Sequence, residues 1–330
     1  MHTREYSPSL GVISPEQFQA ALDRFGLGTC IQAEPIPFGF SKRNVFLTSS
    51  TGEYVFRGAG HSQEQFLREH FFAQQLHERT CVPAPWPYLV DTTEDIFGWS
   101  YAIMPRMPGL QLADPEVRGT LGREDRRGIA RAIGENLAWM QELRWPHAGQ
   151  YNARTNTIEP FVVPYSEWVI ARILHNLARS RQHSERTTDA DVRWVEKLIA
   201  YARYACDDAF QPCFVMQDYK ENNVVVECTG GQWRVSGIFD FTHTHFGDGE
   251  ADFSQLVAMY LDEDPELAGD FMKGYTDYRP LRPGFAGRFP LYMLDNRLGV
   301  WEFFQLIGRT EWNEEWTLRE WASRYTAFLS

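Results

Sequence analysis

The chain has 330 residues, of which 43% are hydrophobic and 23% are charged, which is an ordinary composition for a soluble protein. This length is sufficient for two lobes that each have a hydrophobic core. The formal net charge of −12 argues against nucleic acid as a partner, because phosphate binding requires clustered Lys and Arg.

Other features of the composition bear on location. No run approaches the roughly 20 apolar residues of a membrane span, and the first residues lack the apolar core of a secretory signal. The five cysteines show no metal-ligand spacing, so reduced thiols are expected. We therefore expect a cytoplasmic protein without membrane contact.

The first predicted helix begins at Pro15 and reaches Phe25, with Ser14 as its N-cap. Further along the chain, Phe38–Leu47 predicts a short loop between two strands, for which a plain hairpin is the simplest interpretation. The segment Glu53–Arg57 predicts the next strand.

A long amphipathic helix is predicted over Ser62–Arg79, where Phe66, Leu67, Phe71 and Leu76 fall on one side. After this helix, residues 101–109 predict a strand that runs into a connector rich in Pro and Gly.

The remaining two-thirds of the chain is predicted to be mostly helical, because apolar residues recur there at helical spacing. The predicted helices span residues 123–143, 168–177, 192–206, 253–261 and 289–304. Asp264 followed by Pro265 is typical of one more helix start.

An ordered set of polar residues surrounds a predicted β-hairpin in this region. Val224–Val226 predicts a buried strand directly after Asn223, Thr229–Gly231 predicts the turn, and the returning strand ends at Asp240. The hairpin is therefore expected to bring Asn223 and Asp240 close together. Asp218 lies a few residues before the first strand.

These residues suit phosphoryl transfer, which needs a carboxylate to orient the attacking hydroxyl and oxygen ligands for Mg²⁺. Asp218 is the candidate for the first task, and Asn223 and Asp240 are candidates for the second, because Mg²⁺ prefers hard oxygen donors. For any one of them an ordinary surface role is the simpler interpretation. The ordered set favours the catalytic one.

The pattern Asp-x-x-x-x-Asn, strand, turn, strand and Ile-x-Asp-Phe resembles the signature of protein-kinase-like phosphotransferases. Its continuation over Phe246–Phe253 resembles the aminoglycoside phosphotransferase and choline kinase branch. The resemblance extends over most of the chain. It implies an α+β, two-lobed, protein-kinase-like fold. Residues 1–105 would form a small β-rich nucleotide-binding lobe with one long helix, and residues 106–330 a larger, mainly helical lobe that carries the catalytic hairpin and the substrate site.

The resemblance also implies the residues that bind the nucleotide, which would be ATP or GTP. Ser41 and Asn44 lie in the segment that matches the loop covering the phosphates. Arg57 stands where the family usually has Lys, and Glu69 matches the acid that pairs with this cation. Arg also binds phosphate, in a bidentate manner. The alternative for Glu69 is a solvated acid on the helix surface.

The segment from Met104 to Arg106 matches the hinge, where backbone groups would bind the adenine. Lys220 matches a lysine that meets the transferred phosphate in protein kinases, where antibiotic kinases often have His. It is a second catalytic candidate, through stabilisation of transition-state charge, and a surface lysine is the alternative.

Three departures from the family pattern mark a divergent member. Met216-Gln217 replaces the usual His-Gly before Asp218, and Thr242 replaces the Gly of Asp-Phe-Gly. Arg57 replaces Lys. The resemblance assigns Asp248 and Asp252 to bracing the catalytic loop, and His243 and His245 either face the acceptor or are solvated.

The sequence thus predicts an ATP-dependent, Mg²⁺-dependent kinase for a hydroxyl of a small natural product, such as an aminoglycoside-type antibiotic. The acidic net charge favours a cationic substrate, or serves solubility alone. A metabolic kinase for choline, a sugar or an amino-acid alcohol is one alternative. A nucleotide-binding pseudokinase is the other. The protein is expected to be a monomer or a weak dimer.

Overall fold

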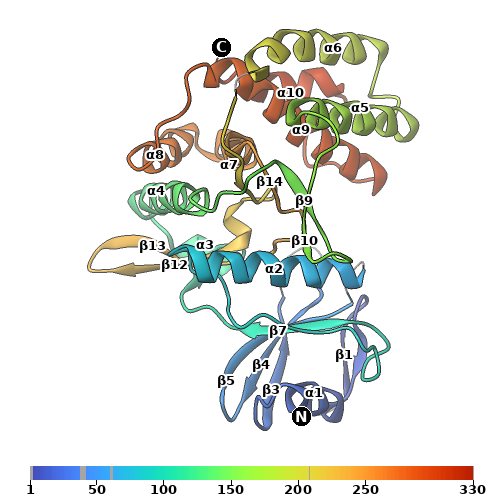
Figure 1. Ribbon diagram of the computed structural model, residues 1–330, viewed down its shortest axis with the longest axis vertical. Helices are drawn as coiled ribbons and strands as arrows, with labels where there is room; N and C mark the ends of the chain where they lie inside the picture. Colours follow the sequence, from blue (N-terminus) through green and yellow to red (C-terminus); the bar gives the residue numbers. More distant parts are fainter. Residues whose placement is uncertain (1–2, 38–41, 60–61, 208, 330) are drawn as a thin grey trace.

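The computed structural model describes residues 3–37, 42–59, 62–207 and 209–329 (Figure 1). A β-rich part that contains the first residues lies at one end of the molecule, and a helical part that contains the last residues lies at the other. Among the described residues no helix is both long and apolar enough to cross a membrane.

The β-rich part consists of a hairpin, a five-stranded sheet and two helices. The strands are β1 (Arg4–Ser7), β2 (Gly11–Ile13), β3 (Cys30–Pro35), β4 (Asn44–Ser49), β5 (Gly52–Arg57), β6 (Leu89–Asp91) and β7 (Tyr101–Pro105), and the helices are α1 (Pro15–Arg24) and α2 (Gln63–Arg79). The sheet is antiparallel with the order β3-β4-β5-β7-β6. The hairpin of β1 and β2 was not predicted from the sequence.

Strand β7 separates two hydrophobic cores, because successive side chains of a strand point to opposite faces of its sheet. Tyr101 and Ile103 belong to the smaller core, which includes Phe18 of α1. Ala102 and Met104 belong to the larger core, which includes α2 and most of the helical part. The sheet is therefore covered on both faces, and α2 is packed between the sheet and the rest of the molecule.

The beginning of α1 confirms the predicted cap. The amide of Gln17 donates to Ser14 Oγ at 3.3 Å, and the amide of Ser14 donates to Gln17 Oε1 at 3.0 Å. This reciprocal pair satisfies backbone donors that the first helical turn leaves free, and Pro15 fits the first helical position.

The helical part surrounds short strands that carry the polar motif. Its helices are α3 (Pro115–Thr120), α4 (Arg123–Met140), α5 (Tyr165–His183), α6 (Asp189–Arg203), α7 (Phe253–Glu263), α8 (Pro265–Thr276), α9 (Phe285–Leu306) and α10 (Leu318–Thr326). Its strands are β8 (Leu110–Gln111), β9 (Gly149–Asn152), β10 (Thr157–Pro160), β11 (Cys213–Val215), β12 (Val224–Thr229), β13 (Gln232–Ile238) and β14 (His245–Gly247). The predicted helices are confirmed, and α3, α10 and the hairpin of β9 and β10 were not predicted.

Helices α4 and α8 approach each other closely through glycines. A Cβ atom on Gly134 of α4 would lie 2.0 Å from the carbonyl oxygen of Phe271, and one on Gly274 of α8 would lie 2.1 Å from that of Arg131. Only glycine permits this distance between the two backbones. The close contact fixes α4, to which Tyr219, just before β12, is hydrogen-bonded.

Candidate active site

Strands β12 and β13 form the predicted hairpin. Val224 pairs with Ile238, and the amide of Phe239 donates to the carbonyl of Asn223 at 3.1 Å. Asn223 and Asp240 consequently stand at the open end of the hairpin. The turn uses Gly230 and Gly231 at φ 60° and 81°, a region that glycine enters without a steric cost.

Three predicted site residues meet at the start of this hairpin. Lys220 Nζ lies 2.7 Å from Asp218 Oδ2, and Asn223 Nδ2 lies 3.2 Å from the same oxygen. Asn223 Nδ2 also donates to the backbone carbonyl of Asp218 at 2.9 Å. The side chains of Asp218 and Lys220 are half-buried, so this carboxylate is fixed in place while solvent still reaches it.

Asp252 braces the segment before Asp218, as the resemblance implied. Its two oxygens accept from the backbone amides of Met216 and Gln217, both at 2.7 Å, and the residue is 1% exposed. Burial raises the pKa of Asp252 to about 7, although the two amide hydrogen bonds act in the opposite direction.

Tyr219 holds the same segment against α4. Its hydroxyl donates to the carbonyl of Ile133 at 2.8 Å and accepts from Asn136 Nδ2 at 3.1 Å. Asp248, the other predicted brace, bonds elsewhere: Tyr292 donates to it at 2.6 Å, and Arg282 also donates to it. Asp248 therefore supports the chain after the hairpin rather than the catalytic segment itself.

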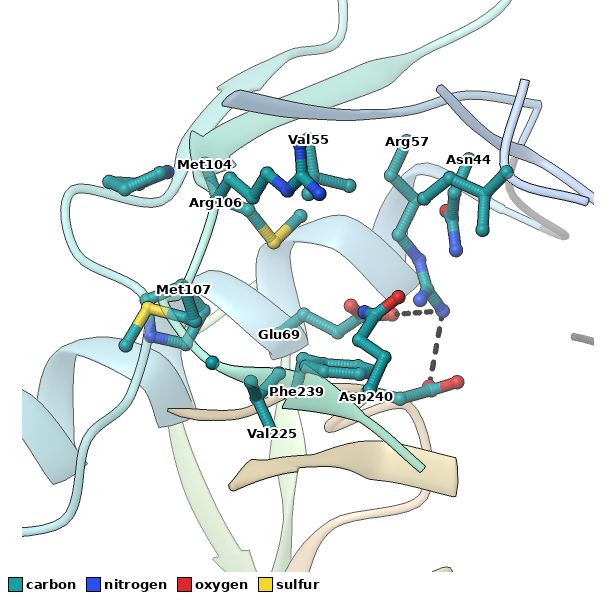
Figure 2. A pocket seen from close by; sticks show the side chains of 15 residues that line it. Asn44, Val55, Arg57, Glu69, Met104, Arg106, Met107, Val225, Phe239 and Asp240 are labelled. Atoms are coloured by element: carbon teal, nitrogen blue, oxygen red, sulfur yellow. Dashed lines mark hydrogen bonds and ion pairs between the residues drawn. The ribbon is translucent and has the colours of Figure 1, made fainter. Parts of the chain in front are cut away.

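Arg57 joins the sheet, helix α2 and the end of the hairpin (Figure 2). Its Nη2 atom lies 3.1 Å from Glu69 Oε1 and 3.1 Å from Asp240 Oδ1. Glu69 is 1% exposed, so the alternative of a solvated surface acid is wrong. Thr242 Oγ1 completes the cluster at 2.8 Å from Glu69 Oε1 and 2.7 Å from Asp240 Oδ1.

Asp240 is held in its ionised form. Burial by itself would raise the pKa of Asp240, but the charge of Arg57 and the hydrogen bonds from Thr242 and Arg57 outweigh it and lower the pKa to about 2. Asp240 also has a φ of 73°, a region that is sparsely populated by residues other than glycine. Such backbone strain is found preferentially at functional sites.

A cavity of about 640 Å³, open to solvent, lies between the sheet and the hairpin (Figure 2). We call it the interlobe cavity. Its lining residues are Ile36, Asn44, Val55, Arg57, Glu69, Pro85, Met104, Pro105, Arg106, Met107, Gly109, Gln111, Val225, Phe239 and Asp240. All predicted nucleotide-binding residues that the structure describes are among them, and Ser41 lies outside the described residues.

The interlobe cavity has apolar walls and a charged end. Val55 and Met104 form the apolar wall on the side of the sheet, and Val225 and Phe239 form the wall on the side of the hairpin. Arg57 and its two acidic partners form the charged end of the cavity. A flat heterocycle fits between apolar walls, and phosphates fit near a cation. The arrangement therefore suits a nucleotide.

The register of β5 and β7 moves the candidate hinge groups from the predicted Met104 and Arg106 to the residues next to them. Met104 pairs with Val55, and the amide of Arg106 donates to the carbonyl of Glu53 at 3.0 Å. Backbone groups of successive residues in an antiparallel strand point to opposite sides. Pro105 C=O and Met107 N–H are therefore the candidate hinge groups directed away from β5, and both residues line the interlobe cavity.

A second hollow lies between α2, the hairpin of β9 and β10, and the beginning of α5. We call it the hairpin groove; it comprises about 1080 Å³ open to solvent. Its lining residues are Glu64, Arg68, Gln150, Tyr151, Asn152, Ala153, Arg154, Glu159, Pro160, Phe161, Val162, Val163 and Trp168. Arg68 Nη1 donates to the carbonyl of Thr242 at 2.9 Å, which places the groove next to the end of the catalytic hairpin.

Sequence reasoning missed the hairpin groove, because its residues form no motif. The one available signal was the succession of apolar residues at Phe161, Val162 and Val163 outside any helical pattern. Val162 is fully exposed, and the rings of Phe161 and Trp168 lie 4.4 Å apart.

The two histidines after Asp240 differ from each other. His243 is exposed, in agreement with a solvated residue, but His245 is 1% exposed and the same interpretation is wrong for it. His245 lies on β14, between β9 and β11, with Tyr165 Oη 3.0 Å from its Nε2. Burial lowers the pKa of His245 to about 3, so this ring is neutral.

Comparison with known proteins gives one family. The model of the family described as "Phosphotransferase enzyme family" matches residues 32–283. A search of curated proteins gives no match.

Several solved structures have a similar fold. A thermostable mutant of aminoglycoside phosphotransferase APH(4)-Ia, in a ternary complex with ADP and hygromycin B, is 14% identical, with a TM-score of 0.67 over 94% of this chain and 96% of that one. The GDP and kanamycin complex of APH(2″)-IIIa is 15% identical, with a TM-score of 0.62 over 95% and 97%. A putative fructosamine-3-kinase from Thermobifida fusca is 19% identical, with a TM-score of 0.63 over 94% and 97%. These similarities confirm the predicted α+β, protein-kinase-like fold.

Proposed function

Because the chain belongs to the phosphotransferase enzyme family, we propose that it is a kinase that uses ATP or GTP with Mg²⁺ to phosphorylate a hydroxyl of a small natural product. The carrying observation is the position of Asp218, Asn223 and Asp240 at the open end of one hairpin, with Asp240 in the interlobe cavity beside Arg57 and Glu69. Phosphoryl transfer depends on positioning and charge stabilisation, which this arrangement supplies.

The nucleotide is proposed to bind in the interlobe cavity. Its base would lie between Val55 and Val225 and bond to Pro105 C=O and Met107 N–H. Its phosphates would extend toward Arg57, whose guanidinium donates to two oxygens at once. The ADP and GDP complexes of the similar structures support a nucleotide as the phosphate donor.

The residues present fit a magnesium ion. The hydrogen bonds of this region use Asn223 Nδ2 and Asp240 Oδ1, which leaves Asn223 Oδ1 and Asp240 Oδ2 as ligand oxygens. Two protein oxygens, completed by phosphate oxygens and water, form a typical magnesium site in kinases. The ion would neutralise charge on the phosphates.

Asp218 is proposed to hold the acceptor hydroxyl and to take its proton. The hydroxyl oxygen forms a bond to the terminal phosphorus, the bond to the bridging oxygen breaks, and the nucleoside diphosphate leaves with the electron pair. Lys220, 2.7 Å from Asp218 Oδ2, is placed to stabilise the charge that develops on the transferred group.

The acceptor is proposed to be of the aminoglycoside type and to occupy the hairpin groove. Phe161 and Trp168 offer ring faces to a sugar, and Glu64 and Glu159 offer carboxylates to amino groups. The hygromycin B and kanamycin complexes of similar structures support this acceptor class. The likeness to a putative fructosamine-3-kinase supports the second candidate, a metabolic kinase, with a sugar as its acceptor.

We propose the boundary between the two lobes at residues 105 and 106. Strand β7 ends at Pro105 and is the last strand of the five-stranded sheet, whereas β8 pairs with β12 of the catalytic hairpin. The chain therefore changes partners between these two strands.

The function is tested by incubating the protein with Mg·ATP or Mg·GTP and a panel of aminoglycosides, choline, sugars and amino-acid alcohols. Mass spectrometry should detect the gain of one phosphate on an aminoglycoside-type compound. Transfer only to a metabolite favours the second candidate. Normal nucleotide binding without transfer to any compound favours the pseudokinase.

A further inference from the structure

The residue directly before Asp218 adopts a conformation that its side chain disfavours. Gln217 has a φ of 71°, in the left-handed region where a Cβ atom approaches the following carbonyl. Glycine occupies this region without cost. A glutamine therefore persists here only because its surroundings hold it.

The side chain of Gln217 is bonded at both of its polar atoms. Arg172 Nη1 donates to Gln217 Oε1 at 2.8 Å, and Gln217 Nε2 donates to Asp295 Oδ2 at 3.2 Å. Arg172 Nη2 lies 3.4 Å from the same oxygen of Asp295 and closes a triangle. We call these three residues the Gln217 clamp.

The Gln217 clamp connects the catalytic segment with two helices, since Arg172 lies on α5 and Asp295 lies on α9. The backbone amide of Gln217 is held separately by Asp252, at 2.7 Å. The residue is thus fixed from its backbone and from its side chain. Because Asp218 follows immediately, these contacts fix the backbone from which its carboxylate extends.

Burial makes the contacts of the clamp costly to break. Asp295 is 5% exposed, and its Oδ1 atom has no hydrogen-bond partner among the described residues. Burial raises the pKa of Asp295, and Arg172 and Gln217 oppose this shift. The acid therefore depends on two neighbours for compensation, and removal of either leaves a poorly compensated buried polar group.

The clamp also reaches the hairpin groove. The guanidinium of Arg172 lies 4.7 Å from the centre of the Trp168 ring, and Trp168 lines this groove. The same arginine thus touches a groove residue and the residue that precedes Asp218. Arg172 therefore connects the wall of the hairpin groove with the segment that carries Asp218.

We propose that the Gln217 clamp is a positioning device that aligns Asp218 with the acceptor, and that Arg172 links this alignment to the wall of the hairpin groove. The catalytic consequence rests on the proposed function, while the effect on the conformation of the catalytic segment does not. None of the three clamp residues lines the interlobe cavity, so nucleotide binding is independent of them.

The first test compares two substitutions on α5. R172M removes the clamp cation, whereas R179M removes a second ion pair between α5 and α9, in which Arg179 Nε lies 2.8 Å from Glu302 Oε1. R172M should lower kcat at least 10-fold and leave the KM for nucleotide within twofold. R179M should leave both values near those of the parent. Equal kcat values in R172M, R179M and the parent would overturn the proposal.

The second test is a rescue. Q217E places a carboxylate against the buried carboxylate of Asp295 and should lower kcat at least 10-fold. In the double variant Q217E/D295N, the amide introduced at position 295 donates to the new carboxylate, and Arg172 still donates to it. The double variant should recover most of the lost rate. A double variant that is slower than Q217E would contradict the clamp.

The third test needs no acceptor. Amide hydrogen exchange over residues 213–223 should be at least 10-fold faster in R172M than in the parent, unchanged in R179M, and restored toward the parent in Q217E/D295N relative to Q217E. Unchanged exchange in R172M would refute the clamp whether or not the protein transfers phosphate. If exchange rises as expected but the parent phosphorylates no acceptor, the clamp stands and the proposed function fails.

Discussion

At the scale of single residues, a few side chains hold the five-stranded sheet, helix α2 and the hairpin of β12 and β13 at fixed positions relative to one another. Arg57 contacts both Glu69 of α2 and Asp240 of the hairpin at 3.1 Å, and Thr242 contacts the same two acids. Charge-assisted hydrogen bonds in a buried setting are strong and directional. A single guanidinium therefore fixes the distance between the five-stranded sheet and the proposed metal site.

The first prediction concerns this guanidinium. R57A leaves two acids facing each other without a cation, so Mg·ATP affinity should fall by at least about 10-fold, consistent with roughly 1.5–3 kcal/mol for a hydrogen bond to a charged group. R57K keeps the charge but loses the fork of donors, and should retain part of the affinity. Isothermal titration calorimetry measures both. Unchanged affinity in R57A would show that the phosphates lie elsewhere.

The second prediction concerns Asp252. Burial raises its pKa from 3.8 to about 7 in the folded protein. A raised pKa means that the folded state binds the proton more tightly than the unfolded state. The contribution of Asp252 to stability is therefore greatest below pH 4 and is lost as the pH rises to 7.

Urea denaturation of the parent and of D252N at several pH values tests this assignment. The free energy of unfolding of the parent, relative to D252N, should decrease between pH 4 and 7 by up to about 1.4 kcal/mol per pH unit. A relative stability that rises over this range would mean that the two backbone amides keep the carboxylate ionised.

At the scale of elements, helix α2 contacts both parts of the molecule and so couples their positions. Phe72 of α2 packs against Phe214 and Phe246 of the short strands, with ring centroids 5.7 Å apart in both pairs. Glu69 lies on the same helix, about one turn earlier. The packing of Phe72 thus helps to position Glu69, which forms the ion pair with Arg57.

The third prediction concerns the contact between α4 and α8. G274A places a Cβ atom 2.1 Å from the carbonyl oxygen of Arg131 and should destabilise the fold by about 1–3 kcal/mol. G269A lies on the same helix, but its new Cβ meets nothing within 4 Å, and it should be neutral or stabilising by up to about 1 kcal/mol. Thermal unfolding distinguishes the two, and an equal effect would contradict the close approach.

The sequence sufficed for the elements whose signals are local. The catalytic hairpin was predicted because two apolar runs flank a turn with two glycines, and α1 because Ser14 and Pro15 mark its start. The Arg57–Glu69 ion pair was predicted from the resemblance to the family and not from the spacing of residues in the sequence.

The remaining parts depend on contacts that no local pattern encodes. Arg172, Gln217 and Asp295 meet only after α5 and α9 have packed together, and the hydrogen bonds that join the three follow no local spacing in the sequence. His245 is buried because β14 is an inner strand of a sheet that the sequence did not predict. Burial that results from tertiary packing cannot be recognised in a short polar segment.

At the scale of the whole molecule, the fold provides two hollows near the candidate catalytic residues. The interlobe cavity adjoins Asp240, and the hairpin groove adjoins Thr242 through Arg68. We propose that these two hollows hold the nucleotide and the acceptor. The chain as a whole has a net charge of −12, which favours the approach of cations.

The fourth prediction concerns this charge. If the acceptor is a cation, its KM should rise with ionic strength, because the screening length falls from about 10 Å at 0.1 M salt to about 3 Å at 1 M. The KM of a neutral acceptor such as a simple sugar is the control and should stay constant. A constant KM for the aminoglycoside would contradict cation attraction and leave phosphotransfer itself untouched.

The most direct test of the account is the phosphotransfer rate of D218N beside that of the parent, with Mg·nucleotide affinity measured on the same samples. Asp218→Asn keeps the size of the side chain but removes its charge and its ability to take a proton. Turnover should fall at least about 10²-fold, the range of a lost general base, while nucleotide affinity stays within about twofold. A D218N variant that phosphorylates the acceptor at the parent rate would contradict the assignment of this site.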